Sequence, residues 1–261
     1  MDETLSVFGT TFAATAALML VVWLLSLVKK DASIVDTFWG LGFVLIAAVC
    51  YATTSGYHER KVLITLLVTV WGIRLASHIF WRNKGKVEDF RYRAMRARFG
   101  NRFPILSLFT VFGLQGLLMW IISLPLQMAQ ISREPARLTS LDWAGAVIWL
   151  IGFLFEAVGD FQLARFKGYA RNKGKVMDRG LWRYTRHPNY FGDALLWWGL
   201  FVIALSTPGG AWTVVSPLIM TGLLIKVSGV ALLEKTLTKT KPEYRDYVRR
   251  TSALFPRMPR G

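Results

Sequence analysis

Seven long apolar segments separated by polar loops dominate this chain of 261 residues. A helix needs about 20 apolar residues to cross the ~30 Å hydrocarbon core of a bilayer. Backbone polar groups find no water in hydrocarbon, so segments of this kind form helices rather than open strands. We therefore predict an all-α integral membrane protein that forms a single transmembrane domain over residues 1–261. The seven predicted spans are residues 6–28, 34–53, 62–81, 104–127, 142–162, 189–206 and 211–233.

Basic residues are distributed unevenly among the loops. The loops after the first, third and fifth predicted spans, together with the C-terminal tail, carry 26 of the 32 Lys and Arg residues. The loops on the opposite side carry only Arg60, Lys61, Arg133 and Arg137. Loops rich in Lys and Arg stay in the cytosol. We therefore predict that the N-terminus lies outside and the C-terminus in the cytosol.

The formal net charge of +16 would suggest nucleic-acid binding in a soluble chain. Here the charge lies in short loops between apolar segments, so membrane lipid is an expected partner and nucleic acid is not. The three large basic segments share one face of the predicted membrane protein, and a polyanionic cofactor bound there would explain their excess. Attraction to anionic lipid is the alternative explanation.

Residues 179–193 change from a polar loop to an apolar helix. Pro188 suits the first turn of a helix, because its φ is fixed and its missing N–H would be unpaired there. We expect the sixth span to begin at about Pro188, with His187 beside its cap. The loop before it carries Arg179, Arg183 and Arg186.

This loop and helix start together predict an anion site. The free N–H groups and the positive dipole end of the helix face the arginines, an arrangement that binds phosphate or pyrophosphate. Asn189 and Asp193 are four residues apart, so they share one helix face and are placed to bind a neutral part of the same ligand. A positive-inside loop with an ordinary helix cap is the alternative.

Ionisable residues inside the predicted spans are costly and indicate function by default. Asp36 lies near the start of the second span, where capping the helix is the alternative role. Arg74 and His78 share a face of the third span, and Arg74 needs a partner such as Asp36. His78 is either a chemical group or a packing residue.

Two further carboxylates lie near the cytosolic end of the fifth span. Glu156 and Asp160 are four residues apart and repel each other unless something bridges them. They are candidates to accept hydrogen bonds from an amide or a ribose, or to pair with Arg165.

Several familiar sites are missing from the sequence. No glycine-rich dinucleotide fingerprint follows a strand, and no phosphate-binding P-loop occurs. The three His and the single Cys, Cys50, cannot form a standard zinc set. We expect no metal site.

The Arg-His-Pro-Asn-Tyr motif within residues 183–193, together with the tail at 242–247 and 255–256, resembles the steroid 5α-reductase family. The segments 33–40 and 88–92 resemble the bacterial branch of that family. The resemblance implies seven transmembrane helices and an NADPH cavity that faces the cytosol, here of a bacterial inner membrane. It also implies reduction of the C=C bond of a hydrophobic enone, such as a 3-oxo-Δ4 steroid. Hydride goes to the β carbon while an acid stabilises the developing enolate.

The resemblance also implies roles for particular residues on the cofactor side, which comprises spans 5–7 and the cytosolic loops. Asn189 and Asp193 match the Asn and Glu with which the family binds its cofactor, although Asp193 has a shorter arm. Asp160 matches a carboxylate of the fifth span, whereas Glu156 stands where the steroid enzymes have Asn. Tyr184, Arg186, His187 and Tyr190 complete the mouth of this site, and Glu234 and the tail close it.

On the substrate side, formed by spans 1–4, the family holds the carbonyl oxygen with a carboxylate and a tyrosine. Asp36 matches the carboxylate. The position of the tyrosine falls near His78, which has no tyrosine beside it. Either His78 donates the proton, or Tyr92 reaches in from the following loop. Each choice places an acid next to Asp36, as general acid catalysis requires.

A membrane methyltransferase of the isoprenylcysteine or phospholipid type is the rival interpretation. Those enzymes share the Arg-His-Pro-x-Tyr motif, bind S-adenosylmethionine and commonly carry a Glu-Glu pair at the end of the last span. Here that place reads Leu233-Glu234. A non-enzymatic lipid-binding or transport protein is a third class, but it gives no reason for Asn189 and Asp193 at an arginine-lined mouth.

Overall fold

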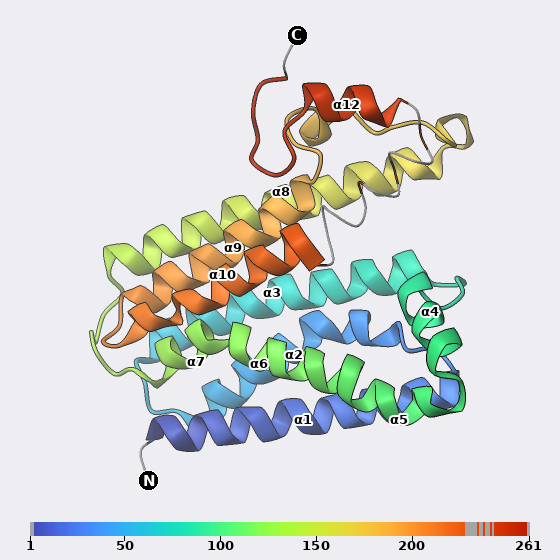
Figure 1. Cartoon of the computed structure of the whole chain (residues 1–261). Coiled ribbons are helices and arrows are strands. Elements are labelled where there is room, and N and C mark those ends of the chain that lie inside the picture. Colours follow the sequence, from blue (N-terminus) through green and yellow to red (C-terminus); the bar gives the residue numbers. More distant parts are fainter. Residues whose placement is uncertain (1–2, 228–233, 235–236, 238–240, 242, 260–261) are drawn as a thin grey trace. The chain divides into compact units, whose positions relative to one another are not determined.

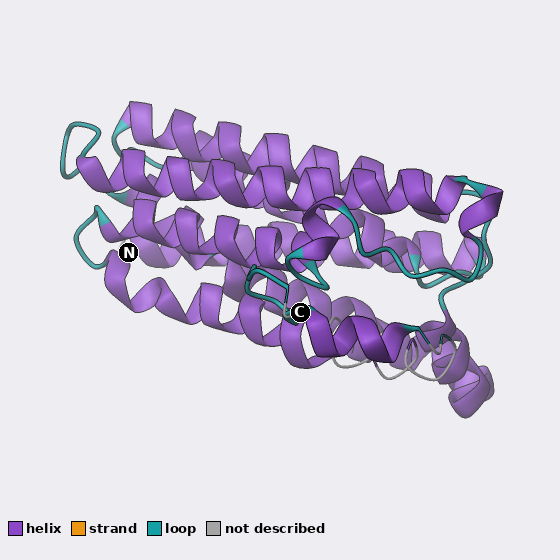
Figure 2. Cartoon of the chain, turned by 90° about the horizontal axis from the view of Figure 1, so that it is seen from above, coloured by secondary structure: helices purple, strands orange, loops and turns teal. Residues whose placement is uncertain are grey.

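The regular elements of the described residues are all helices. The computed structural model describes residues 3–227, 234, 237, 241 and 243–259. Within these ranges there is no strand, only one isolated parallel bridge between Thr185 and Ser252 (Figure 2). The chain divides into two compact units, of residues 1–139 with 204–213 and residues 140–203 with 214–261.

The first unit is built on three long helices that run side by side in Figure 1: α1 (Glu3–Lys29), α2 (Ile34–Thr53) and α3 (His58–Asn83). Helices α2 and α3 approach closely through two glycines, because a Cβ on Gly40 would lie 2.5 Å from the Gly72 carbonyl oxygen. Phe43 and Trp71 fill the core beside this contact, with ring centroids 5.6 Å apart.

The rest of the first unit is formed by shorter helical elements that follow one another along the chain. Residues 104–127, predicted as a single span, contain α-helix, π-helix and a second α-helix before α7 begins. Pro125 suits the first turn of the last helix for the reason given for Pro188. The elements are α4 (Phe90–Phe99), η1 (Gly100–Arg102), α5 (Phe103–Ser107), the π-helix η2 (Leu108–Gly113), α6 (Leu114–Ile122) and α7 (Leu124–Ile131), with η5 (Gly210–Val214) at the boundary of the two units.

The second unit centres on α8 (Ser140–Gly168) and α9 (Pro188–Leu205). Gly145, Gly152 and Gly159 recur along α8 and face α9. A Cβ on Gly152 would lie 2.6 Å from the Gly192 carbonyl oxygen, so only glycine allows this approach. The remaining elements are η3 (Ala170–Asn172), η4 (Gly180–Arg183), α10 (Val215–Gly222), the π-helix η6 (Leu223–Val227) and α12 (Tyr244–Arg250).

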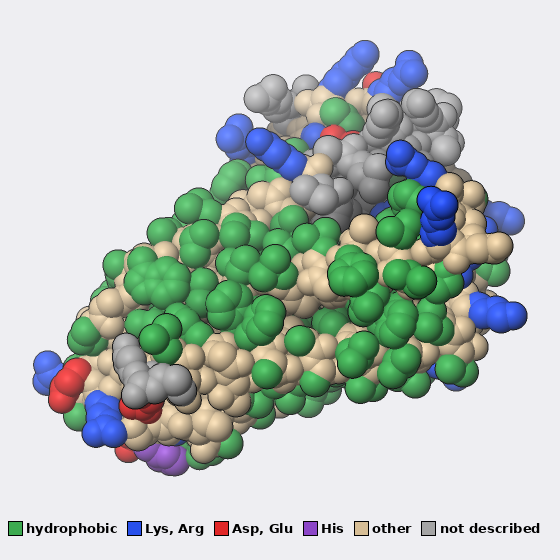
Figure 3. Space-filling model, turned by 60° about the horizontal axis from the view of Figure 1, so that its bottom comes forward, with side chains coloured by type: hydrophobic (Ala, Val, Ile, Leu, Met, Phe, Trp, Pro, Cys, Tyr) green, Lys and Arg blue, Asp and Glu red, His purple; other side chains and the backbone are tan. Residues whose placement is uncertain are grey.

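Among the described residues, five helical segments are long and apolar enough to cross a membrane. Large apolar side chains are exposed along them, and many hydrophobic side chains are visible in Figure 3. The prediction of an all-helical fold is confirmed for the described residues, and these helices are compatible with a multi-pass membrane protein. The five segments are Glu3–Lys29, Ile34–Thr53, His58–Asn83, Phe90–Ile122 and Ser140–Gly168.

The last two predicted spans correspond to shorter helices. Helix α9 covers 18 residues, and residues 210–227 form the start of the span predicted at 211–233. Residues 228–233 of that span lie outside the described residues. Seven spans and the orientation of the termini therefore stay predictions.

The glycine contact between α8 and α9 can be tested by one methyl group. We expect Gly152→Ala to lower the free energy of unfolding by about 1–3 kcal/mol, because its Cβ meets backbone atoms that cannot move aside. Gly9→Ala in α1 is the matched control, since a Cβ there meets nothing within 4 Å. Thermal unfolding in detergent measures both. Equal melting temperatures for the two variants would contradict the contact.

Candidate active site

The loop of residues 179–187, here called the motif loop, is held by the C-terminal tail. The Arg186 backbone N–H donates to the Ser252 carbonyl at 2.9 Å, beside the Thr185–Ser252 bridge. The Thr185 hydroxyl donates to the Leu254 carbonyl at 2.8 Å. The backbone carbonyls of the tail thus accept hydrogen bonds from the motif loop and hold it in place.

Arg186 makes the strongest contacts between the loop and the tail. Its guanidinium donates to both oxygens of Glu234, from Nε at 2.7 Å and from Nη2 at 3.1 Å. Nη1 donates to the backbone carbonyls of Val248, at 3.1 Å, and Thr251. The Arg186 side chain is only 8% exposed. A buried guanidinium with this many charge-assisted bonds fixes the position of both segments.

Trp182 and Tyr247 join the motif loop to α8 and to the tail. The Trp182 indole N–H donates to the Gly159 carbonyl at 3.0 Å. The Tyr247 hydroxyl donates in turn to the Trp182 carbonyl. Burial raises the pKa of Tyr247, so its hydroxyl stays a donor at neutral pH. The loop is therefore packed against α8 as well as the tail.

His187 lies where the sequence predicts, directly before α9, which begins at Pro188. Its Nε2 is 3.2 Å from Glu234 Oε1, and its ring stacks on Tyr190 with centroids 5.4 Å apart. Burial would raise the pKa of the Glu234 carboxyl, but hydrogen bonds from His187 and Arg186 outweigh it and the pKa is lowered. Glu234 therefore remains ionised and binds both motif residues.

Asn189 lies in the first turn of α9 against a carboxylate of α8. Its Nδ2 donates to Asp160 Oδ1 at 3.0 Å. Its Oδ1 is closed to solvent and has no hydrogen-bond partner among the described residues. A buried amide oxygen without a donor costs about 1–3 kcal/mol, so this atom indicates a place for a ligand N–H. Glu156 lies on α8 one turn before Asp160 and is buried. Asp193, one turn after Asn189 on α9, is half-buried.

The other predicted cofactor residues lie nearer the solvent. Arg179 and Arg183 are exposed on the motif loop, and Tyr184 is at its edge. Arg165 is exposed and hydrogen-bonds Tyr169. Because Arg186 is already bound to Glu234 and the tail, an anion at this loop would meet Arg179 and Arg183 instead.

In the first unit, the segment predicted as a basic loop contains α4, which brings a tyrosine to Asp36. The Tyr92 hydroxyl donates to Asp36 Oδ1 at 2.8 Å and accepts from Gln115 Nε2 at 3.1 Å. Arg91 Nη2 donates to Asp36 Oδ2 at 3.0 Å. Asp36 is therefore not a simple helix cap: Arg91, rather than Arg74, is the cation that pairs with it.

The start of α4 is fixed by carboxylates. Asp89 caps the helix by accepting from the Arg91 backbone N–H at 2.9 Å, and it also accepts from Arg91 Nε. Glu88 binds Arg96 and the Ala32 N–H. Burial would raise the pKa of Glu88, but these hydrogen bonds lower it overall. The turn before α2 and the start of α4 are thereby tied together.

Of the two residues predicted as alternative proton donors, Tyr92 contacts Asp36. His78 is half-buried on α3 and is not among the partners of that carboxylate. The sequence places Asp36 and Tyr92 in one site only through the resemblance to a family. Asp89 before the basic residues 90–99 is an N-cap signal, and it was the one local feature that pointed to α4.

A model of the family described as "Protein of unknown function (DUF1295)" matches residues 22–251. The chain is similar to the "Uncharacterized protein C594.04c" of Schizosaccharomyces pombe. The two are 23% identical over 265 residues, covering 91% of this chain and 76% of the yeast protein. No solved structure matches this chain.

The lowered pKa of Glu234 makes its contribution to stability depend on pH. The pKa of the Glu234 carboxyl is 4.5 in the unfolded chain and lower in the folded state. The stability that the ionised carboxylate contributes is therefore present above about pH 4.5, and it is lost as pH falls through the lower folded pKa. We expect Glu234→Gln to cost about 1.5–3 kcal/mol at neutral pH. The gap in melting temperature between it and the wild type should close in acid.

The matched control is Glu243→Gln, which removes an exposed carboxylate of the tail. The difference in melting temperature between this variant and the wild type should stay small at every pH. If the gap for Glu234→Gln is the same at neutral and acidic pH, the bonds from Arg186 and His187 do not depend on the carboxylate charge.

Proposed function

We propose that this chain, which belongs to the DUF1295 family, is an NADPH-dependent oxidoreductase that reduces the C=C bond of a hydrophobic enone of the 3-oxo-Δ4 steroid type. That family includes steroid 5α-reductase-like membrane proteins. The observation that carries the proposal is the hydrogen bond between Tyr92 and Asp36. Reduction of an enone needs an acid at the carbonyl oxygen, whereas transfer of a methyl group from a sulfonium does not.

Tyr92 is the proposed acid. When a carbonyl oxygen takes the place of Asp36 as acceptor, the Tyr92 hydroxyl donates to it and stabilises the negative charge that develops there. Gln115 continues to donate to the phenol oxygen, which orients the ring. Arg91 keeps the Asp36 carboxylate paired when Tyr92 donates to the substrate instead.

The residues around Asn189 fit a nicotinamide cofactor. Asn189 Oδ1 is buried and lacks a donor among the described residues, and the carboxamide of a nicotinamide ring supplies such an N–H. Asp160 accepts from Asn189 Nδ2 and fixes which way the amide points. When bound, NADPH supplies the hydride for the β carbon. Arg179 and Arg183, exposed on the motif loop, are proposed to meet its phosphates.

The proposal includes seven membrane spans with the C-terminus and the cofactor site on the cytosolic side of a bacterial inner membrane. The five long apolar helices support a multi-pass protein. The orientation is supported by the basic residues, of which 26 of 32 fall on one side in this topology. A hydrophobic substrate would reach the enzyme from the lipid.

Cofactor binding tests the proposal first. NADPH at about 100 times its dissociation constant should stabilise the protein by ~2.7 kcal/mol, measured as a thermal shift in detergent. Asn189→Ala should remove the shift, because the carboxamide N–H of the nicotinamide ring then lacks its acceptor. The control Asn101→Ala changes an exposed asparagine and should keep it. Stabilisation by S-adenosylmethionine and not by NADPH would replace the reductase with a methyltransferase.

The role of Tyr92 is tested by turnover. We expect Tyr92→Phe to lower kcat for a 3-oxo-Δ4 steroid by roughly 10²–10⁴-fold, the usual contribution of a general acid, and to leave NADPH binding unchanged. Tyr169→Phe, at an exposed tyrosine, should behave as the wild type. If His78→Gln abolishes turnover while Tyr92→Phe does not, His78 rather than Tyr92 is the donor.

A further inference from the structure

The last described part of the tail, residues 251–259, exposes two large apolar side chains. Phe255 is 61% exposed and Met258 is 80% exposed. Arg257, which lies between them in the sequence, is exposed as well. We call Phe255, Arg257 and Met258 the tail tip. None of the three is among the residues proposed to bind the cofactor or the substrate. Apolar side chains of this size favour contact with an apolar partner over contact with water.

The backbone of the tail tip is held by the motif loop. On one side of the tip, the Leu254 carbonyl accepts from the Thr185 hydroxyl at 2.8 Å. Within the tip, the Arg257 N–H donates to the Tyr184 carbonyl at 3.0 Å. Pro256 has a fixed φ and restricts the residue before it to extended backbone. The tip is therefore ordered before it meets a partner, which lowers the entropic cost of binding.

A row of aromatic rings connects the tail tip to α8 within the second unit. The Phe255 ring lies 6.1 Å from the Phe191 ring in the first turn of α9, measured between centroids. The Phe191 ring lies in turn 5.1 Å from the Phe155 ring on α8. Helix α8 is one of the five segments long and apolar enough to cross a membrane. Two ring contacts thus join the tip to a candidate membrane span.

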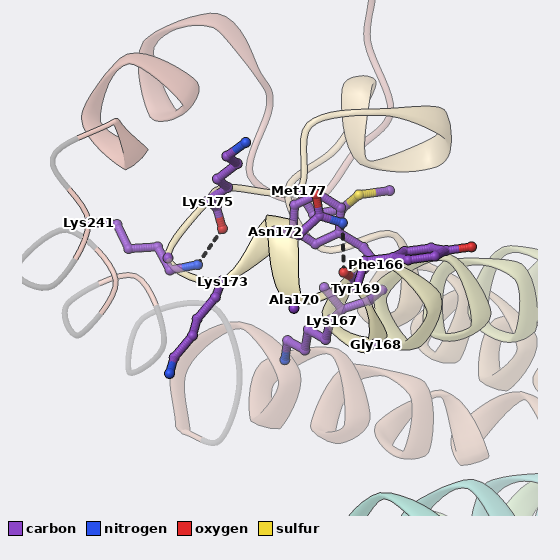
Figure 4. A pocket seen from close by; sticks show the side chains of 12 residues that line it. Phe166, Lys167, Gly168, Tyr169, Ala170, Asn172, Lys173, Lys175, Met177 and Lys241 are labelled. Carbon is purple, nitrogen blue, oxygen red and sulfur yellow. Dashed lines mark hydrogen bonds between the residues drawn. The ribbon is translucent and has the colours of Figure 1, made fainter.

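The level of this contact in a membrane follows from the charges at the end of α8. Phe161 is exposed and apolar, whereas Arg165 lies in the last turn. Figure 4 shows Lys173 and Lys175 on the loop that follows the helix. Arg165 follows Phe155 by ten residues, or about 15 Å of helix. Because lipid-facing apolar residues give way to cations at the headgroups, the tail tip lies near the boundary between hydrocarbon and headgroups.

We propose that the tail tip inserts into the lipid–water interface and thereby anchors the motif loop. Phe255 and Met258 contact the acyl chains, and Arg257 reaches the lipid phosphates. The same stretch of tail accepts the Arg186 N–H at the Ser252 carbonyl, so contact with lipid stabilises the position of the loop.

A bilayer fits the tail tip better than a second copy of the chain. Three side chains cannot supply the ~800 Å² that each partner buries in a standard protein interface. The inference rests on the membrane location proposed above, but it does not depend on the reductase reaction.

The depth of the tail tip can be measured with a spin label on the full chain in nanodiscs. Cys50→Ala removes the single native thiol, and Met258→Cys then carries a nitroxide. Electron paramagnetic resonance compares its access to oxygen, which dissolves in lipid, with its access to a nickel chelate, which stays in water. Labels on Arg249→Cys, at an exposed residue of α12, and on Leu154→Cys, at an exposed residue of α8, are the water and lipid references.

We expect the label at position 258 to resemble the one at position 154. If it resembles the label at position 249 instead, the tip lies in water and the proposal is wrong. If the label at position 154 is itself open to the nickel chelate, the membrane location is wrong and the proposal falls with it.

Hydrogen exchange tests whether the tip anchors the motif loop. Phe255→Ser/Met258→Ser should raise the exchange rate of a peptide that covers Arg186 by roughly tenfold, the effect of losing one large apolar contact. Ile105→Ser/Phe109→Ser, at two exposed apolar residues of the first unit, is the matched control and should leave that rate unchanged. An unchanged rate in the tip variant, or an equal rise in the control, would show that the tip does not anchor the loop.

Discussion

The ion pair between Arg186 and Glu234 is the contact on which the second unit's candidate site depends. It joins the motif loop to a residue that follows the last apolar segment, and the same guanidinium binds the tail carbonyls of Val248 and Thr251. His187 shares the carboxylate. With Trp182 packed on α8, these contacts fix the position of the loop that leads into α9, and hence where Asn189 lies. A basic motif that looks like a ligand-binding cluster is therefore partly a structural clamp.

The long helices of the described residues could be predicted because they depend on local chemistry. Apolar length gives the helices, and the fixed φ and missing N–H of Pro188 give the start of α9. The change of helix type within the segment predicted as the fourth span could not be foreseen, because the π-helix at Leu108–Gly113 leaves no pattern that differs from an ordinary apolar helix. The close approach at Gly152 was likewise hidden, since its partner Gly192 is distant in sequence.

In the candidate site, too, features set by neighbouring residues could be predicted, whereas contacts between residues distant in sequence could not. The shared face of Asn189 and Asp193 follows from helix periodicity. The pairing of Asp36 with Arg91 and Tyr92 requires α4, whose side chains read as a basic loop in the sequence. The burial of Arg186 could not be foreseen either, because it depends on Glu234 and on carbonyls of the tail that carry no side-chain signal.

The most direct measurement of the central claim, hydride transfer, uses NADPH deuterated at the transferable position of the nicotinamide ring. The purified protein is incubated with this cofactor and a 3-oxo-Δ4 steroid, and the product is analysed by mass spectrometry and NMR. We predict a saturated ketone with deuterium at the former β carbon, and loss of that product in Asn189→Ala. A saturated product without deuterium, or a methylated product formed only with S-adenosylmethionine, would contradict the claim.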